Sequence, residues 1–549
     1  MNMRTQFEFP FHFPLDIEKK YKKAVAYFSM EFAIDQALKI YSGGLGFLAG
    51  SHMRSAKSLN QHLVGIGMLW KYGYYDQGRN QDNSMVPIRH EKIYHFLQRT
   101  GVRFQVTIED RGVWVEAYYL APDVFGSAPV FLLTTDVEGN QEADRAITYQ
   151  LYDYDTKKKV EQCMILGIGG AILLEKLKWK PQVYHFNEAH AISAAFYLYG
   201  QASTFTALKQ QIVFTTHTPE EAGNEKHDIN FLNHLGFFSG LPLEEVRNLS
   251  GNSGELFNHT LAALHLSRKA NAVSKLHGEV AREMWKGHPG SCEIIHITNA
   301  QKKSFWVDEA LELARVSRNI QGLRARKRAL KVALFEMVAD QCGKLLDPDV
   351  LTIVWARRFA TYKRPDMLIW ELERFRKLME DQERPVQVIW AGKPYPQDEG
   401  AIKIFNDLFY LSHHFSNMAV LTGYELSLSK SLKQGADIWL NTPVVTREAS
   451  GTSGMTAAMN ATLNLSTNDG WVREFAQDQV NSFLLPIATT EDINKTDADN
   501  LYRSLLHQVL PTYYEHPELW MKMVLRSMDD VATAFDSDRM AAEYYQRLY

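Results

Sequence analysis

Short apolar runs alternate with helical patterns along most of this 549-residue sequence. Runs such as 183–186 and 350–355 are rich in β-branched and aromatic residues and are bounded by Gly, Pro or charged residues. The segments between runs, such as 159–177, are long enough for helices. This alternation is typical of α/β proteins with parallel sheets. The other runs predicted as strands are 24–28, 63–70, 113–120, 130–135, 212–215, 386–391, 419–421 and 438–440.

The chain is too long for one hydrophobic core, so several domains are expected. The alternation is interrupted over 304–340, a charged amphipathic stretch that we interpret as a bridge between domains, and it then restarts. We predict an N-terminal Rossmann-like domain over 1–303 and a second one over 304–530. The remaining residues, 531–549, form a predicted C-terminal helix that could cross back to the N-terminal domain.

Composition argues against several classes of partner. A net charge of −4 leaves no basic footprint for nucleic acid or an anionic membrane. The three cysteines are few and far apart, so neither a disulfide framework nor a metal-ligand cluster is indicated. The longest apolar run, 163–174, is shorter than the roughly 18–20 residues of a membrane span, and 1–23 lacks the core of a signal peptide. We expect a cytoplasmic protein without metal, nucleic-acid or membrane partners.

In open α/β sheets ligands bind at the carboxyl ends of strands, so motifs that follow the predicted strands are candidates for a site. Residues 447–460 follow the apolar run 436–440 and read Arg-Glu-Ala-Ser-Gly-Thr-Ser-Gly-Met-Thr-Ala-Ala-Met-Asn. A strand, a glycine loop and a helix N-terminus favour anions, and Glu448 adds a carboxylate for sugar hydroxyls. The spacing matches neither a P-loop nor a dinucleotide motif, so an ordinary tight turn is an equally valid interpretation.

Two more loops carry the same ambiguity. The glycine-rich loop 41–46 has backbone amides that could cradle phosphate, although it is also consistent with a plain turn. The loop 355–365 follows a buried strand, and its Arg358 and Lys363 could clamp phosphate oxygens unless the loop is simply solvated. His190 and His217 also follow strands, and each is either a sugar ligand or a structural histidine.

Together these motifs resemble the α-glucan phosphorylases, the glycogen and starch phosphorylase family, and especially its short branch. The resemblance implies the glycosyltransferase-B fold, with two Rossmann-like domains facing an active-site cleft. It also implies retaining glucosyl transfer from α-glucan or maltodextrin to phosphate, pyridoxal 5′-phosphate acting through its phosphate group, and a homodimer. The motifs are Tyr-Phe-Ser-Met-Glu-Phe at 27–32, Ser-Gly-Gly-Leu-Gly at 42–46, Asn-Glu-Ala-His at 187–190, Asn-Ala-Val-Ser-Lys-Leu-His at 271–277, and residues 358–364 and 448–455.

The resemblance also implies roles for individual residues, with catalysis assigned to Arg358, Lys363, His190 and Glu448. The substrate phosphate would be bound by Arg358, Lys363 and the glycine amides, and the cofactor phosphate by Arg357 and Thr452. The glycine amides are those of Gly43 and Gly44. The residues implied around the glucosyl unit are Leu45, His190, Asn271, Glu448, Ser450 and Gly451.

One departure from the family pattern affects the cofactor. The lysine that forms the Schiff base in the family directly follows the Met of Gly-x-Met, and Thr456 stands there in this chain. Threonine cannot form an imine, so we expect any pyridoxal phosphate to be held without a covalent bond. Ala300 also replaces an expected glycine, and the chain is much shorter than the animal enzymes, so their regulatory sites are not carried over.

Two alternative functions remain open at this point. A retaining transferase that uses a sugar nucleotide could place a diphosphate at the two anion positions, although glycogen synthases of similar fold carry a lysine where Tyr41 stands. A non-catalytic glucan-binding protein is the other alternative, because loss of the cofactor lysine could mark loss of activity.

Overall fold

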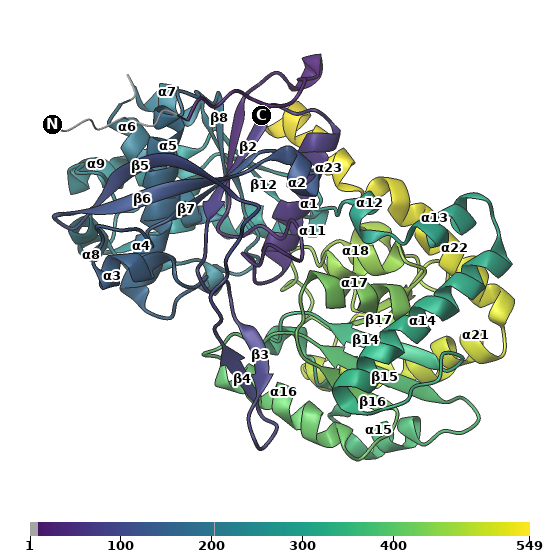
Figure 1. Ribbon diagram of the computed structural model, residues 1–549. Helices are drawn as coiled ribbons and strands as arrows, with labels where there is room; N and C mark the ends of the chain where they lie inside the picture. The colour runs from purple at the N-terminus through teal and green to yellow at the C-terminus, as the bar shows by residue number, and fades with distance from the viewer. Residues whose placement is uncertain (1–8, 202–203) are drawn as a thin grey trace. The chain divides into compact units, whose positions relative to one another are not determined.

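The computed structural model describes residues 9–201 and 204–549, so the first eight residues of the N-terminal stretch considered above lie outside it. The chain forms two compact units, each built on its own largely parallel sheet (Figure 1). Unit 1 contains the chain up to Tyr75, Arg89–Thr298 and Met540–Tyr549, and unit 2 contains Asp76–Ile88 and Asn299–Arg539. The predicted α/β class with two parallel-rich sheets is confirmed.

The sheet of unit 1 has the strand order β13-β12-β9-β8-β1-β2-β7-β6-β5. From β13 to β7 neighbouring strands are parallel, and β6 and β5 add an antiparallel edge. The chain leaves β1 in one direction toward β2 and returns on the other side at β8, which makes a topological switch point between β1 and β8. The strands are β1 (Val25–Phe28), β2 (Leu63–Met68), β5 (Gln98–Ile108), β6 (Arg111–Leu120), β7 (Val130–Thr134), β8 (Val183–Asn187), β9 (Ile212–Thr215), β12 (Lys269–Ala272) and β13 (Glu293–His296).

Helices cover this sheet, and a two-stranded ribbon of β10 (Lys226–Asp228) and β11 (Leu256–Asn258) lies outside it. The predicted helix 159–177 is present as α4 and α5, joined by a wider turn at Ile165–Gly169. The α-helices are α1 (Gly44–Ser58), α2 (Pro122–Phe125), α3 (Glu142–Arg145), α4 (Thr156–Met164), α5 (Gly170–Lys176), α6 (Ser193–Tyr199), α7 (Phe205–Lys209), α8 (Ile229–Leu235), α9 (Leu243–Ser250), α10 (His259–Leu266) and α11 (Lys275–Trp285).

The sheet of unit 2 is parallel throughout, with the order β16-β15-β14-β17-β18-β19. This is the 3-2-1-4-5-6 order of a doubly wound Rossmann sheet, with its switch point between β14 and β17. Strands covered on both faces are expected to be continuously apolar, and all residues of β14 are buried. The strands are β14 (Leu351–Ala356), β15 (Val386–Ala391), β16 (Met418–Leu421), β17 (Ile438–Asn441), β18 (Leu463–Ser466) and β19 (Phe483–Leu484).

The interpretation of 304–340 as a bridge between domains is wrong, because the stretch folds as three helices that belong to unit 2. The chain turns at Arg318, which has a φ of 56°, and the side chain of Asn319 then caps the next helix by accepting from Gly322 N. The helices of unit 2 are α12 (Lys303–Trp306), α13 (Glu309–Val316), α14 (Ile320–Cys342), α15 (Leu372–Met379), α16 (Glu399–Ser412), α17 (Leu426–Gly435), α18 (Ser453–Ala458), α19 (Val472–Phe475), α20 (Ile493–Ser504), α21 (Leu510–Tyr514) and α22 (Pro517–Ala534).

A hairpin from the first part of the sequence belongs to unit 2. Its strands β3 (Asp76–Arg79) and β4 (Met85–Ile88) lie beside α16 in Figure 1. The Arg79 guanidinium stacks 3.5 Å from the ring centroid of Phe409 and donates to the carbonyl of Val420. Gln77 Nε2 donates to the carbonyl of Gly392 at 2.8 Å. The hairpin is therefore fixed by specific contacts, and sequence patterning did not anticipate this assignment.

The C-terminal residues are divided between the units. Helix α23 (Ser537–Glu543) begins in unit 2, and residues from Met540 onward belong to unit 1. Tyr549 is buried there, with its hydroxyl 2.7 Å from His185 Nδ1. The guanidinium of Arg268 donates to the carbonyl of Leu548 at 3.0 Å.

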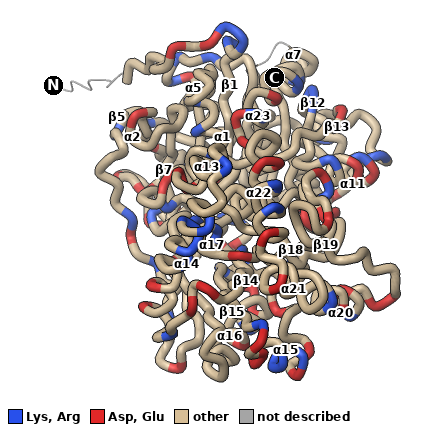
Figure 2. The backbone as a smooth tube through the Cα atoms, turned by 90° about the vertical axis from the view of Figure 1, so that its right-hand side faces the viewer, with Lys and Arg blue, Asp and Glu red and all other residues tan. Residues whose placement is uncertain are grey.

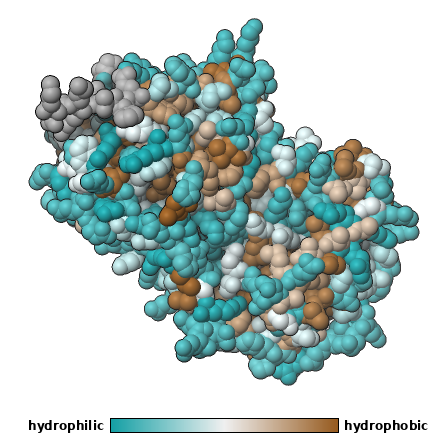
Figure 3. Space-filling model, viewed as in Figure 1, coloured by the Kyte–Doolittle hydropathy of each residue, from teal (hydrophilic) through white to brown (hydrophobic). Residues whose placement is uncertain are grey.

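Charged residues of both signs are interspersed along the chain in the view of Figure 2. On the face shown in Figure 3, hydrophobic residues form separate small groups among hydrophilic ones. Within residues 9–201 and 204–549, every helix is too short or too polar to span a bilayer. The same residues contain no cluster of His, Cys, Asp and Glu suited to hold a metal ion.

Candidate active site

The best candidate site in unit 2 lies at its topological switch point. Arg357 directly follows β14, and the loop that contains Glu448 follows β17, the strand paired with β14 on the other side. Neighbouring parallel strands end at the same edge of a sheet, so these two loops meet. The short helical turn Thr361–Lys363 brings a second cation to the same place.

One carboxylate oxygen of Glu448 accepts from both cations. Lys363 Nζ lies 2.8 Å and Arg357 Nη1 3.3 Å from Glu448 Oε2. The side chains of Lys363 and Glu448 are only 11% and 12% exposed. Buried charges are costly unless they are paired, so the Glu448 carboxylate acts as the internal counterion of a cationic site.

The ionisation of Glu448 follows from these contacts. Burial alone would raise the pKa of this carboxyl, but the charges of Lys363, Arg357 and Arg358 together lower it below its ordinary value. Arg358 is exposed, and its charge acts on Glu448. Glu448 is therefore ionised at neutral pH and can accept hydrogen bonds from hydroxyl groups.

The Glu448 loop is held by Asp469 and two glycines. The Asp469 carboxylate accepts from the amides of Glu448 and Gly470, each at 2.9 Å. Burial raises the pKa of Asp469 to about 6. Gly451 has a φ of 89°, and a Cβ there would also lie 3.2 Å from Glu448 Cγ, so only glycine fits without strain.

Two buried donors near this loop lack a protein partner among the described residues. They are Arg357 Nε and Ser450 Oγ, while Arg357 Nη2 donates to the Asn441 side chain and to Ser453 Oγ. Thr452 is half-buried and directly precedes α18. A buried guanidinium N–H without a partner among the described residues, next to a second cation, fits a further anion, such as the phosphate of the cofactor implied by the resemblance.

The same structure does not fit a covalent bond at position 456. Thr456 is 0% exposed, and its hydroxyl donates to the carbonyl of Ser453 within α18. Its neighbour Met455 packs in a core cluster with Trp471 and Val531. The residues present therefore fit the phosphate end of pyridoxal phosphate and offer no amine on α18.

The candidate site in unit 1 also lies at a switch point. Glu31 follows β1, and its carboxylate accepts from the amides of Ser42 and Gly43 at 2.6 and 3.2 Å. The Tyr152 hydroxyl donates to the other Glu31 oxygen at 2.8 Å. Glu31 thus fixes the glycine loop at the start of α1, and its place in the motif 27–32 was the only sequence signal for it.

Neither the backbone conformation nor the packing within unit 1 requires glycine at positions 43 and 44. Neither residue has a left-handed φ, and a Cβ at either position would meet nothing within 4 Å. Gly44 is exposed, and the Gly44 and Leu45 amides open α1, where helix geometry provides no acceptor. Glycines with open space around them are consistent with close approach of a ligand to the backbone.

His190 follows β8, the strand on the other side of the switch point. Its Nδ1 is buried without a protein partner among the described residues, and its ring centroid lies 6.0 Å from that of Tyr152. Burial lowers the pKa of His190, and the nearby carboxylates of Glu225 and Glu31 oppose this only in part. His190 is therefore a neutral imidazole that can exchange a hydrogen bond with a hydroxyl.

Asn271 and His217 are bonded within unit 1. Asn271 is 0% exposed, accepts from Thr215 Oγ1 at 2.6 Å and donates to the carbonyl of Ala272. Thr215 Oγ1 also lies 2.6 Å from His185 Nε2, which continues the network to Tyr549. His217 Nε2 bonds to the Asn187 side chain at 2.7 Å. Of the predicted residues in this unit, the structure thus brings together the glycine loop and His190, and it holds Asn271 in a buried network.

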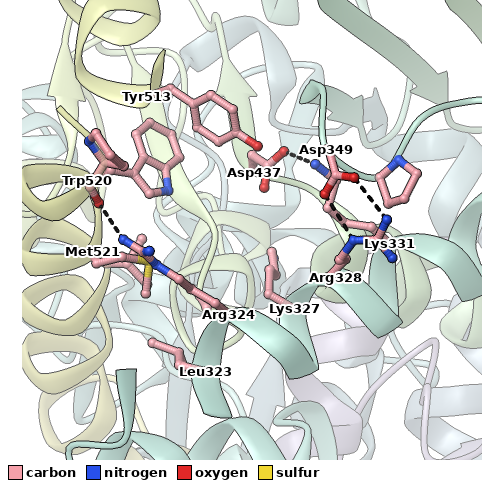
Figure 4. A pocket seen from close by; sticks show the side chains of 14 residues that line it. Leu323, Arg324, Lys327, Arg328, Lys331, Asp349, Asp437, Tyr513, Trp520 and Met521 are labelled. Atoms are coloured by element: carbon pink, nitrogen blue, oxygen red, sulfur yellow. Dashed lines mark hydrogen bonds and ion pairs between the residues drawn. The ribbon is translucent and has the colours of Figure 1, made fainter. Parts of the chain in front are cut away.

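A separate cavity of about 260 Å³ in unit 2 is lined by other residues than those of the predicted site (Figure 4). Asp349 and Asp437 precede β14 and β17, so the cavity lies at the amino ends of the strands. Its cations are already neutralised or bonded: Lys331 lies 2.5 Å from Asp437, and Arg328 is paired with Asp349 at 2.9 Å. Lys327 donates to two carbonyls and to Thr462 Oγ1.

Comparison with known proteins identifies relatives over nearly the whole chain. Residues 301–507 match a family model described as carbohydrate phosphorylase. An uncharacterized protein of Methanocaldococcus jannaschii is 45% identical over 96% of this chain and 100% of its own length. The maltodextrin phosphorylase of Thermococcus litoralis is 34% identical over 96% of this chain and 71% of its own. The glycogen phosphorylase of Aquifex aeolicus is 30% identical over 97% and 87%, respectively.

Proposed function

The chain belongs to the carbohydrate phosphorylase family, and we propose that it transfers glucosyl units with retention from α-1,4-glucan to phosphate, releasing glucose 1-phosphate. The observation that carries this proposal is the convergence of Lys363 and Arg357 on one oxygen of Glu448 at the switch point of unit 2. A cationic site whose internal counterion is a single carboxylate is suited to exchange that contact for phosphate oxygens. The named relatives act on maltodextrin or glycogen by their printed names, which supports the choice of glucan.

The binding roles proposed for unit 2 follow from charge and position. Lys363 and Arg358 bind the substrate phosphate, as a point charge and a planar fork respectively. Arg357, through its unpaired Nε, and Thr452 hold the phosphate of pyridoxal phosphate. When bound, that phosphate supplies acid–base chemistry beside the substrate phosphate.

The residues proposed to contact the glucosyl unit are divided between unit 1 and unit 2. The amides of Gly43 and Gly44 bind phosphate, and neutral His190 and ionised Glu448 orient sugar hydroxyls. Preorganised donors and acceptors of this kind stabilise charge that develops as the glycosidic bond breaks. Leu45, Ser450 and Gly451 complete the proposed sugar subsite.

The test is release of glucose 1-phosphate from maltodextrin and phosphate by the purified protein, with and without added pyridoxal phosphate. Lys363→Met removes one of the proposed phosphate ligands and is expected to lower turnover by at least about 10²-fold, the usual cost of losing a preorganised charged donor. Lys377→Met, at an exposed lysine in the last turn of α15, is the control and should leave turnover unchanged.

The alternatives predict different results in the same assay. Glucosyl transfer from a nucleoside diphosphate glucose without phosphorolysis would indicate the sugar-nucleotide transferase. Glucan binding without turnover under any condition would indicate a non-catalytic protein. The presence of Thr456 where the family has its Schiff-base lysine favours this alternative. Turnover that is unchanged in Lys363→Met would remove the phosphate assignment of this lysine.

A further inference from the structure

Lys433 is a buried lysine that none of the roles above uses. It lies on α17 and is 1% exposed. Its Nζ is 3.9 Å from the ring centroid of Trp306 and 6.0 Å from that of Trp439. The amine is therefore flanked by two indoles inside unit 2.

Trp439 is hydrogen-bonded to α18, the helix that carries Thr456, and Trp306 is hydrogen-bonded to Asn460, which follows that helix. Trp439 Nε1 donates to Ser453 Oγ at 3.2 Å. The side-chain Nδ2 of Asn460 donates to the carbonyl of Trp306 at 3.0 Å and to the carbonyl of Thr456 at 2.8 Å. Lys433 thus reaches, from the neighbouring helix α17, the surroundings of the position where the family lysine is missing.

The same amine lies near the proposed cofactor phosphate site. Ser453 Oγ, which bonds to Trp439, also accepts from Arg357 Nη2 at 3.3 Å, and the charge of Arg357 acts on Lys433. A lysine within electrostatic range of Arg357, the proposed ligand of the cofactor phosphate, suits a ligand that carries both a phosphate and a carbonyl group.

The electrostatic surroundings suit an amine that acts as a nucleophile. Burial, followed by the charge of Arg357, lowers the pKa of Lys433 well below its ordinary value of 10.5. A desolvated lysine next to another cation has a larger neutral fraction at neutral pH, and only the neutral amine attacks a carbonyl.

We propose that Lys433 replaces the missing lysine at position 456 and holds pyridoxal phosphate through an imine. This inference rests on the proposed function for the presence of the cofactor. In the reaction, the Nζ lone pair attacks the aldehyde carbon, the two amine protons leave with the carbonyl oxygen as water, and a carbon–nitrogen double bond forms. No oxidant or reductant takes part.

The experiment is reductive trapping followed by peptide mapping of the full-length protein. The protein is incubated with pyridoxal phosphate, reduced with borohydride and digested, and the pyridoxyl-modified peptide is identified by tandem mass spectrometry. The modification is expected on Lys433, together with the near-ultraviolet absorbance of an imine before reduction. Modification of another lysine, or no modification of the wild-type protein, would overturn the proposal.

Variants extend the test without relying on activity. Lys433→Met and Lys433→Arg should both lose the reducible adduct, and the arginine variant keeps the positive charge if the methionine variant fails to fold. Lys430→Met, one turn earlier on α17, is the matched control and should keep the adduct. In Lys433→Met combined with Thr456→Lys, the adduct should return at position 456, and its absence there would contradict the claim that both side chains serve one site.

Failure of this inference can be distinguished from failure of the proposed function. Phosphate-dependent release of glucose 1-phosphate without an adduct on Lys433 would support the proposed function and refute the role of Lys433. An adduct on Lys433 without any phosphorolysis would support the attachment site and refute the function.

Discussion

The replacement Glu448→Gln tests the central electrostatic feature of unit 2. It removes the charge that pairs with Lys363 at 2.8 Å and Arg357 at 3.3 Å and keeps the size of the side chain. Two cations would remain in a buried site without their internal counterion. We therefore expect lower stability of unit 2 and stronger binding of an external anion.

The magnitude follows from the geometry. Two unit charges about 3 Å apart attract by roughly 5–6 kcal/mol at an effective dielectric constant of 20, before desolvation is subtracted. Breaking a buried ion pair by removing one partner typically costs about 3–5 kcal/mol, and the lower end applies because both side chains keep some exposure. A loss of about 3 kcal/mol corresponds to a decrease of roughly 6–12 °C in the melting temperature of a unit of this size.

The assay is thermal unfolding and phosphate titration of the wild type and the variant. In the wild type, phosphate must compete with Glu448 for Lys363, whereas in Glu448→Gln it meets cations that lack an anion. If bound phosphate recovers about half of the lost free energy, the affinity for phosphate rises about tenfold. The control is Glu380→Gln, at an exposed carboxylate after α15, which should change stability by no more than about 0.5 kcal/mol.

Two results would refute this reasoning. Equal stability of Glu448→Gln and Glu380→Gln would mean that the carboxylate does not neutralise buried cations. Equal phosphate affinities in the wild type and Glu448→Gln would mean that phosphate does not replace this carboxylate.

Three further predictions concern the supports of the two sites. Gly451→Ala should lower the free energy of unfolding by about 1–3 kcal/mol because of its left-handed φ, whereas Gly400→Ala, in the first turn of α16, should not, as denaturant unfolding would show. The raised pKa of Asp469 means that the folded state binds the proton more tightly, so its contribution to stability is present at low pH and is lost as pH rises through about 6. Asp469→Asn should flatten stability between about pH 4 and 6, and an unchanged slope would contradict this. Tyr549→Phe leaves His185 Nδ1 without its 2.7 Å partner and should cost unit 1 about 1–3 kcal/mol; no change in its melting temperature would remove the anchoring role.

Much of the fold could be predicted from sequence, because buried parallel strands are continuous apolar runs. The predicted run 386–391 coincides with β15, and the predicted 130–135 matches β7 within one residue. Short strands escaped detection: Lys269–Ala272 contains charge and small residues, and Lys226–Asp228 contains no apolar residue. Their positions depend on tertiary pairing rather than on local pattern.

The hairpin 76–88 shows a second limit of sequence reasoning. Its residues lie between strands of unit 1 in the sequence, so patterning assigns them to the first domain. The contacts of Arg79 with Phe409 and Val420 place them in unit 2. Such long-range contacts leave no periodic signal in the chain.

The candidate site could be predicted only in part. Motifs located Lys363, Arg357 and Glu448, but not that both cations share one oxygen. Asp469, which holds the Glu448 loop, lies outside every motif used. The position of Lys433 next to the helix of Thr456 depends on how α17 packs against α18, and this is a property of tertiary structure.

The most direct test of the proposed reaction is a phosphorus and proton NMR time course with maltodextrin, inorganic phosphate and pyridoxal phosphate. The account predicts that α-glucose 1-phosphate accumulates as inorganic phosphate disappears, with the wild type and not with Lys363→Met. Formation of the β anomer, or no sugar phosphate from folded protein that still binds glucan, would contradict it.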